Sequence, residues 1–204
     1  SKPSEMAVLE DIFSPKIGIL THIGTAHSSN FKNEEQLIEE KILLFKNSET
    51  ILFNGDNVLV YNKIKGIYPD KKLISFGLEN RNDVKIISNP ENLQEEIKVQ
   101  YFSEEFSFPA NQRDEATLTN ALALVCVMKE LGFSNEKIVE KINALKAVEM
   151  RLESVNGIHN NLIINDSFNL ELDYLIIAFQ FIKQYNKLEK NLNLTDIIDV
   201  KEEE

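Results

Sequence analysis

The sequence predicts an α/β protein with a parallel sheet. A strand pattern, a polar loop, a helix pattern and a second strand pattern follow one another between residues 16 and 54, which is typical of a parallel α/β unit. Strong helix patterns between residues 115 and 145 fit the same class. Apolar residues make up 43% of the 204 residues, so the composition allows a packed core and does not fit a disordered chain.

The first elements are a helix, a strand and a loop. Pro3 and Ser4 are helix-start residues, and apolar residues at helical spacing follow them, so 4–13 reads as a short amphipathic helix. Residues 16–21 are an apolar run bounded by turn residues, consistent with a buried strand. Because ligands gather at the carboxyl ends of strands in parallel sheets, the loop at 22–30 is the first place to look for chemistry.

The middle of the chain continues this pattern and then changes. Residues 34–45 place their apolar side chains mostly on one face of a helix, and 50–54 is the next strand candidate. Between 72 and 108 the apolar runs are short and are separated by Gly, Asn, Pro and Glu, which predicts an antiparallel section. These strand candidates are 73–76, 84–87, 97–102 and 106–108.

The last part of the chain begins with two helices. A helix over 115–131 ends at Gly132, a natural C-cap, and Ser134 caps a second helix. Two strands around a turn and a final helix close the chain, at about 151–155, 162–165 and 172–186.

Composition excludes several classes of protein. The net charge is −11, from 33 acidic and 22 basic residues, so non-specific nucleic-acid binding is not expected. One cysteine, Cys126, excludes an intramolecular disulfide framework and reads as a buried structural thiol. No apolar stretch reaches the roughly 20 residues that span a bilayer, and no signal peptide opens the chain, so we expect a soluble, cytoplasmic protein with no membrane partner.

Few residues stand out for chemistry. A lone histidine such as His27 is more often a surface or hydrogen-bonding residue than a ligand, and no histidine pair or Cys partner has zinc spacing. Lys41 has only apolar residues three and four positions away, so no helical ion pair explains it. Asn120 lies in an apolar helix segment, where a polar side chain needs a ligand or the backbone as partner. Asp166 ends an apolar strand, a common position for a ligand site and for a helix cap.

The sequence lacks the short motifs that would by themselves indicate phosphate binding or nucleophilic catalysis. None of the seven glycines forms a G-x-x-x-x-G-K-[ST] phosphate loop, and there is no G-x-S-x-G elbow. The residues alone therefore predict an α/β domain with a small-molecule site near 22–30, 120, 151 and 166.

Six short segments, taken in order, resemble those of the Mur ligases, and the resemblance covers nearly the whole chain up to about residue 186. Within the family, the sequence most resembles the ligases that add D-alanyl-D-alanine to UDP-N-acetylmuramoyl-tripeptide. The form it resembles is the one that some members carry fused to an alanine racemase. The segments are Lys2–Leu9, Ile17–His27, Glu40–Ile42, Asn120–Ala123, Met150–Glu153 and Asn165–Asn169.

The resemblance implies a fold and a reaction. The fold is a Rossmann-like three-layer central domain without its phosphate-loop strand, over 1–147, and the start of a second α/β domain, over 148–204. The partners are a UDP-sugar peptide and a dipeptide: ATP phosphorylates the substrate carboxylate, and the incoming amine displaces phosphate. His27 matches a magnesium ligand, and Lys41 matches a lysine that becomes carbamylated and helps to hold Mg²⁺, which oxygen ligands suit.

The resemblance also implies a nucleotide site. Asn120 matches the Asn that contacts adenine. Arg151 and Asp166 match a pair that reaches ATP. Ser167 and Asn169 lie in the same loop and are weaker candidates.

The sequence departs from the family in three respects. His22 stands where the family usually has Asn, and the loop after Asp166 lacks the common Tyr-Asn-Ala-Asn-Pro continuation. The phosphate loop, an acidic magnesium ligand and the UDP-binding domain are expected before residue 1, and the C-terminal domain is expected to continue past residue 204. On this interpretation the chain alone lacks ligase activity and has an exposed sheet edge, which favours self-association.

Two alternatives remain open at this point. One is a related ligase with another substrate, such as a different Mur step or a folylpolyglutamate synthetase. The other is a non-catalytic binding module that has kept the fold.

Overall fold

The computed structural model describes seven stretches of the chain, and the predicted site residues His27, Arg151 and Asn169 lie outside them. The stretches are 3–24, 30–91, 94–110, 113–145, 152–168, 172–183 and 189–193. The chain divides into two compact units. The first unit comprises Ser1–Ile23 and Asn30–Ala144, and the second comprises Gly24–Ser29 and Leu145–Glu204. The predicted domain boundary between 147 and 148 stays a prediction.

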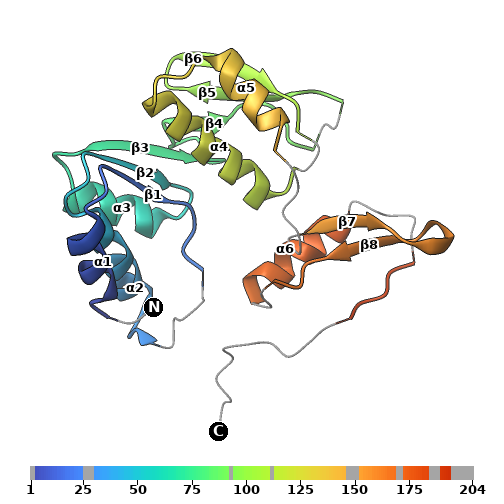
Figure 1. The fold of residues 1–204 in the computed structure, drawn as a ribbon, viewed down its shortest axis with the longest axis horizontal. Coiled ribbons are helices and arrows are strands. Elements are labelled where there is room, and N and C mark those ends of the chain that lie inside the picture. The colour runs from blue at the N-terminus through green and yellow to red at the C-terminus, as the bar shows by residue number, and fades with distance from the viewer. Residues whose placement is uncertain are drawn as a thin grey trace, which may run out of the picture. The chain divides into compact units, whose positions relative to one another are not determined.

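A six-stranded mixed sheet forms the centre of the first unit (Figure 1). Its order is β1-β2-β3-β4-β5-β6, with parallel pairing from β1 to β4 and antiparallel pairing from β4 to β6. The strands are β1 (Ile17–Leu20), β2 (Thr50–Asn54), β3 (Lys72–Gly77), β4 (Val84–Ile86), β5 (Ile97–Tyr101) and β6 (Glu104–Phe108).

The predicted antiparallel section is right only in part. The pairs β4–β5 and β5–β6 are antiparallel, but β3 is parallel to both β2 and β4. β3 and β4 are joined by the short segment 78–83, but for the β2–β3 pair the reason is the helix α3 (Val58–Ile67), which the hydrophobic pattern did not predict and which serves as the crossover. Such a crossover is what a parallel pair requires.

The helix α3 has clear start and packing signals once the structure is known. The Asn57 side chain accepts hydrogen bonds from Leu59 N at 2.9 Å and from Val60 N at 3.2 Å, which caps the helix. Val60 and Ile64, one helical turn apart, are buried. The segment is rich in Val, Tyr and Ile, which favour strands, so its composition hides its helical period.

Helices cover both faces of the sheet, as the three-layer prediction requires (Figure 1). Alternation along β2 shows this: Ile51 and Phe53 pack with residues of α2 and α3, whereas Leu52 packs with residues of α4. The remaining helices of this unit are α1 (Glu5–Phe13), α2 (Glu34–Ile42) with its 3₁₀ extension η2 (Leu43–Phe45), α4 (Glu115–Glu130) and α5 (Asn135–Asn143). The helices of the described stretches are all too short or too polar to cross a bilayer.

One edge of the described sheet is β1, where Ile19 is 42% exposed. This is the edge at which self-association is predicted, and that association stays a prediction.

The second unit contains a hairpin and a helix. β7 (Glu153–Asn156) and β8 (Leu162–Asn165) are antiparallel and are joined through the 3₁₀ turn η3 (Ile158–Asn160). The helix α6 follows at Leu172–Lys183. The predicted strands and final helix are confirmed in these residues.

Cys126 is fully buried in the middle of α4, which confirms that its thiol is structural. Burial, followed by the nearby acidic charges of Glu130 and Asp83, raises the pKa of this thiol. The unfolded thiol therefore loses its proton first, and stability is lost as the pH rises above about 8.5. We expect the free energy of unfolding to fall more steeply in the unsubstituted chain than in Cys126→Ala, by up to about 1.4 kcal/mol per pH unit.

The measurement is urea unfolding at several values between pH 8 and pH 10. Parallel slopes for the two proteins would show that the thiol ionises equally in the folded and unfolded states.

Candidate functional site

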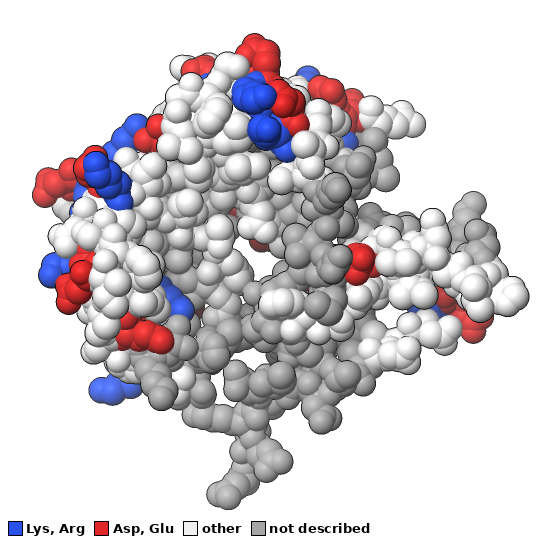
Figure 2. Space-filling model, in the orientation of Figure 1, with Lys and Arg blue, Asp and Glu red and all other residues white. Residues whose placement is uncertain are grey.

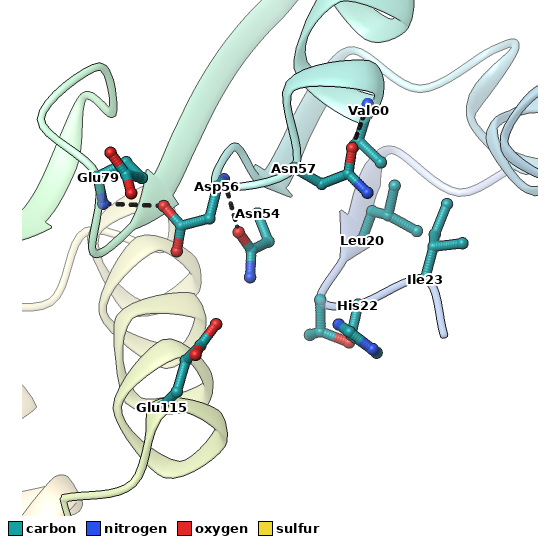
Figure 3. A pocket seen from close by; sticks show the side chains of 10 residues that line it. Leu20, His22, Ile23, Asn54, Asp56, Asn57, Val60, Glu79 and Glu115 are labelled. Atoms are coloured by element: carbon teal, nitrogen blue, oxygen red, sulfur yellow. Dashed lines mark hydrogen bonds between the residues drawn. The ribbon is translucent and has the colours of Figure 1, made fainter. Parts of the chain in front are cut away.

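A pocket of about 330 Å³ lies at the carboxyl ends of three parallel strands of the first unit (Figure 3). β1 contributes Leu20 and the residues after it, β2 contributes Asn54, and the segment after β3 contributes Glu79. This is the region where ligands of open α/β sheets bind. The described residues that line it are Leu20, Thr21, His22, Ile23, Asn54, Asp56, Asn57, Val60, Glu79 and Glu115.

Asp56 fixes the wall of the pocket that follows β3. Its carboxylate accepts hydrogen bonds from Leu78 N at 2.9 Å, from Glu79 N at 2.9 Å and from Asn82 Nδ2 at 2.7 Å. Asp56 is itself held, because its N–H donates to Asn54 Oδ1 at 2.9 Å. Two loops that are distant in sequence are therefore tied together at the rim of the pocket, as the dashed line between Asp56 and Glu79 in Figure 3 shows.

A second carboxylate supports the same loop from the other end. Asp83 Oδ2 accepts from Ser75 N at 2.9 Å and from Ser75 Oγ at 2.7 Å, and Asp83 N donates to Ser75 Oγ at 3.0 Å. The segment between β3 and β4 is thus anchored at both ends, which gives the pocket a preformed wall.

Asn57 connects the pocket to helix α2. Besides capping α3, its Nδ2 donates to Glu34 Oε1, in the first turn of α2, at 3.0 Å. Farther along the same two helices, Lys63 Nζ lies 2.6 Å from Glu39 Oε1, and this hydrogen bond raises the pKa of Lys63. The helix that carries Lys41 is therefore joined to the helix that follows the pocket.

The pocket is lined by acidic and neutral side chains. Asp56, Glu79 and Glu115 line it together with His22, and no lysine or arginine is among its described lining residues. Carboxylates repel phosphate groups and attract hydrogen-bond donors and cations. The lining therefore suits a neutral or cationic ligand group. On the face shown in Figure 2, acidic and basic side chains are interspersed over the residues drawn in colour, which does not resemble a phosphate-binding surface.

Of the predicted site residues that the structure describes, none is among the residues that line this pocket. Lys41 is half-buried on α2, and Asn120 is exposed on α4, both in the first unit. Asp166 and Ser167 directly follow β8 in the second unit. Within the described part of the chain, the structure brings together only those last two.

A polar network surrounds Asp166 at the open end of the β7–β8 hairpin. Its Oδ1 accepts a hydrogen bond from Leu152 N at 3.2 Å. Leu152 has φ of 47°, an uncommon left-handed conformation for a residue other than glycine. Ser167 Oγ donates to Asn165 Oδ1 at 2.7 Å, and Asn165 Nδ2 donates to Glu153 Oε2 at 3.3 Å. The residues just after β8 are therefore bonded to the residues at the start of β7.

The described residues do not supply a metal site by themselves. Among them, no group of three or more His, Cys, Asp and Glu side chains is arranged to hold a metal ion. The magnesium prediction therefore depends on Lys41 and on His27, which lies outside the described residues.

The sequence reasoning missed most of the pocket wall. Asn54 ends the second parallel strand and Asp56 and Asn57 come just after it, and polar residues at that position are the signal that could have identified them. Glu79 follows the third parallel strand and carries the same signal, but that strand was not predicted to be parallel; Glu115 carries no such signal, because only the packing of α4 brings it to the pocket.

Comparisons with known proteins point to one family. A family model described as the Mur ligase middle domain matches residues 1–128. UDP-N-acetylmuramoylalanine–D-glutamate ligase of Alkaliphilus oremlandii is 29% identical over 163 residues, which are 76% of this chain and 34% of that protein. UDP-N-acetylmuramoyl-tripeptide–D-alanyl-D-alanine ligase of Bacillus subtilis is 23% identical over 206 residues, which are 98% of this chain and 43% of that protein.

Solved structures agree on the fold. MurF from Acinetobacter baumannii has a TM-score of 0.77 at 19% identity, over 90% of this chain and 40% of that one. MurF from Thermotoga maritima, in complex with ADP, has a TM-score of 0.72 at 21% identity, over 90% of this chain and 42% of that one. The chain spans 34% and 43% of the length of the two curated relatives above.

Proposed function

Since residues 1–128 match its middle domain, the chain belongs to the Mur ligase family, and we propose that it forms the ATP-site part of a peptide ligase. The proposed reaction adds D-alanyl-D-alanine to UDP-N-acetylmuramoyl-tripeptide. Relatives named for that reaction, from Bacillus subtilis and Rickettsia prowazekii, align over 98% and 88% of this chain, and this coverage is the observation that carries the proposal.

The residues of this chain are assigned supporting roles in that reaction. ATP supplies the phosphate that activates the substrate carboxylate for attack by the amine. We assign nucleotide contacts to Asn120 and Asp166, and a carbamylated side chain to Lys41. Ser167 is a weaker candidate for a nucleotide contact. Magnesium would be held by Lys41 and His27, and we assign no step of the reaction to the ion.

The pocket fits the amine or nucleoside end of such a reaction better than a phosphate. Asp56, Glu79 and Glu115 can accept hydrogen bonds from an ammonium, amino or hydroxyl group. The phosphates of ATP favour a surface of positive charge or of backbone N–H groups, and the described lining has three carboxylates and no lysine or arginine.

A different Mur step is the second candidate function. The diaminopimelate ligase of Clostridium acetobutylicum is 30% identical over 162 residues, a higher identity than that of the Bacillus protein over a shorter alignment. Turnover with each amino substrate in turn, D-glutamate, diaminopimelate or D-alanyl-D-alanine, separates these ligases. A cytoplasmic location belongs to the proposal for either step.

Nucleotide binding tests the proposal. We expect an ATP analogue with magnesium to bind a longer form of the protein that carries an upstream phosphate loop, and to bind this chain much more weakly. In the longer form, Asp166→Ala is expected to weaken binding about tenfold, since the substitution removes the acceptor of Leu152 N as well as any ligand contact. The measurement is isothermal titration calorimetry.

Ser154→Ala is the matched control, because Ser154 is exposed on β7 of the same hairpin and has no assigned nucleotide contact. It should stay within about threefold of the unsubstituted protein. Absence of binding by both forms would reject the ligase proposal and favour a binding module with the same fold.

A further inference from the structure

Glu40 of α2 is a buried carboxylate that binds the first turn of another helix. It is 7% exposed. Its Oε2 accepts a hydrogen bond from Ser4 N at 2.8 Å, and its Oε1 accepts one from Met6 N at 2.9 Å. A buried carboxylate is unfavourable unless charge-assisted hydrogen bonds satisfy it. Here the two N–H groups do so, and the positive end of the α1 dipole adds to their effect.

Helix α1 depends on this contact for its start. Ser4 is its N-cap residue, but it has φ of 70° and makes no side-chain capping hydrogen bond. The N–H groups of a first helical turn have no partner within their own helix. Two of these donors are satisfied by a side chain that lies 34 to 36 residues later in the chain.

The other contacts of α2 described above are more exposed. Glu34 bonds to Asn57 near the start of the helix, and Glu39, whose side chain is 50% exposed, pairs with Lys63. Exposed pairs of this kind hold a helix weakly because water and salt screen them. Glu40 is the buried attachment, and it lies in the last turn of α2, directly before Lys41.

We propose that Glu40 is the positioning residue for Lys41. By joining the end of α2 to the start of α1, it fixes the backbone from which the half-buried Lys41 side chain extends. Both carboxylate oxygens are occupied by backbone N–H groups, so Glu40 acts through its neighbour and not on a ligand. The inference rests on the carbamylated role proposed for Lys41.

The test is carbon-13 NMR of the chain equilibrated with carbon-13 bicarbonate. Lys41→Arg identifies the carbamate signal of Lys41, because a guanidinium forms no carbamate. We expect Glu40→Ala to lower the Lys41 carbamate occupancy at least about threefold at fixed pH and bicarbonate, the effect of one or more lost hydrogen bonds. Glu40→Gln keeps one acceptor oxygen and should restore part of the signal.

Glu39→Gln is the matched control, since it changes the neighbouring exposed acid on the same helix and should leave the signal unchanged. Amide hydrogen exchange at Ser4 and Met6, measured on the same variants, reports whether the start of α1 has been released. Glu40→Gln keeps the test valid if Glu40→Ala does not fold.

The outcomes separate the two proposals. If the unsubstituted chain shows no signal that depends on Lys41, the role proposed for Lys41 fails, and this inference fails with it. If the signal is present and Glu40→Ala and Glu40→Gln leave it unchanged while exchange at Ser4 and Met6 accelerates, Glu40 is only an anchor for α1. In that case the inference alone is overturned.

Discussion

Gly77→Ala is expected to lower the free energy of unfolding by at least about 3 kcal/mol. A Cβ at this position would lie 2.2 Å from Asp56 Oδ1 and 2.5 Å from both Cγ and Oδ2 of the same carboxylate. The carboxylate cannot move away without releasing Leu78 N, Glu79 N and Asn82 Nδ2. Gly77 also has φ of 158°, a conformation that residues with a side chain rarely adopt.

Urea unfolding measures this loss, and Gly66→Ala is its control. Gly66 lies in α3, and an added Cβ there meets nothing within 4 Å. Alanine should therefore stabilise the helix by about 0.5–1 kcal/mol. If the clash with Asp56 is the cause, Gly77→Ala should add little to the cost of Asp56→Ala in a double-mutant cycle. Additive costs of the two substitutions would contradict this explanation.

Lys41→Ala is expected to lower kcat of the complete ligase by about 100-fold or more, the range seen when one electrostatic group is removed from an active site. The proposed reason is loss of the carbamate anion that helps to hold magnesium. Lys41→Arg should not restore activity, because a guanidinium keeps the positive charge and forms no carbamate. ATP-dependent phosphate release, with all three substrates present, is the measurement.

Lys46→Ala is the control for a general effect of lost positive charge. Lys46 is exposed just after η2, five residues from Lys41. Its substitution should leave kcat within about twofold, as for most surface changes. A Lys41→Ala enzyme as active as this control would remove Lys41 from the proposed site.

Helices and strands whose ends are marked by capping or turn residues could be predicted from the sequence, whereas the strands and helices that they pack against could not. Helix α5 was predicted from Ser134, whose side chain does accept a hydrogen bond from Lys137 N, and the predicted C-cap Gly132 has φ of 80°. The parallel pairing of β3 with β2 was missed because it depends on α3, whose Val- and Ile-rich sequence hides a helix.

The candidate site also has a part that the sequence predicted and a part that it did not. The loop after β1 was predicted as a ligand site, and Thr21, His22 and Ile23 do line the pocket. Glu79 reaches it from the segment after β3 and Glu115 from the start of α4, 57 and 93 residues beyond His22. No local pattern encodes that proximity, since it results from packing of the sheet against a distant helix.

The order of strands in the first unit bears on how it folds. Each strand from β1 to β6 pairs with the strands next to it in the chain, so the sheet is built without pairing strands that are remote in sequence. Pairing of neighbours keeps each loop closure shorter than a shuffled strand order would, although the parallel pairs still close over residues 21–49 and 55–71. Every new strand can add to an edge that already exists. The first unit can therefore assemble in the order in which a ribosome releases it.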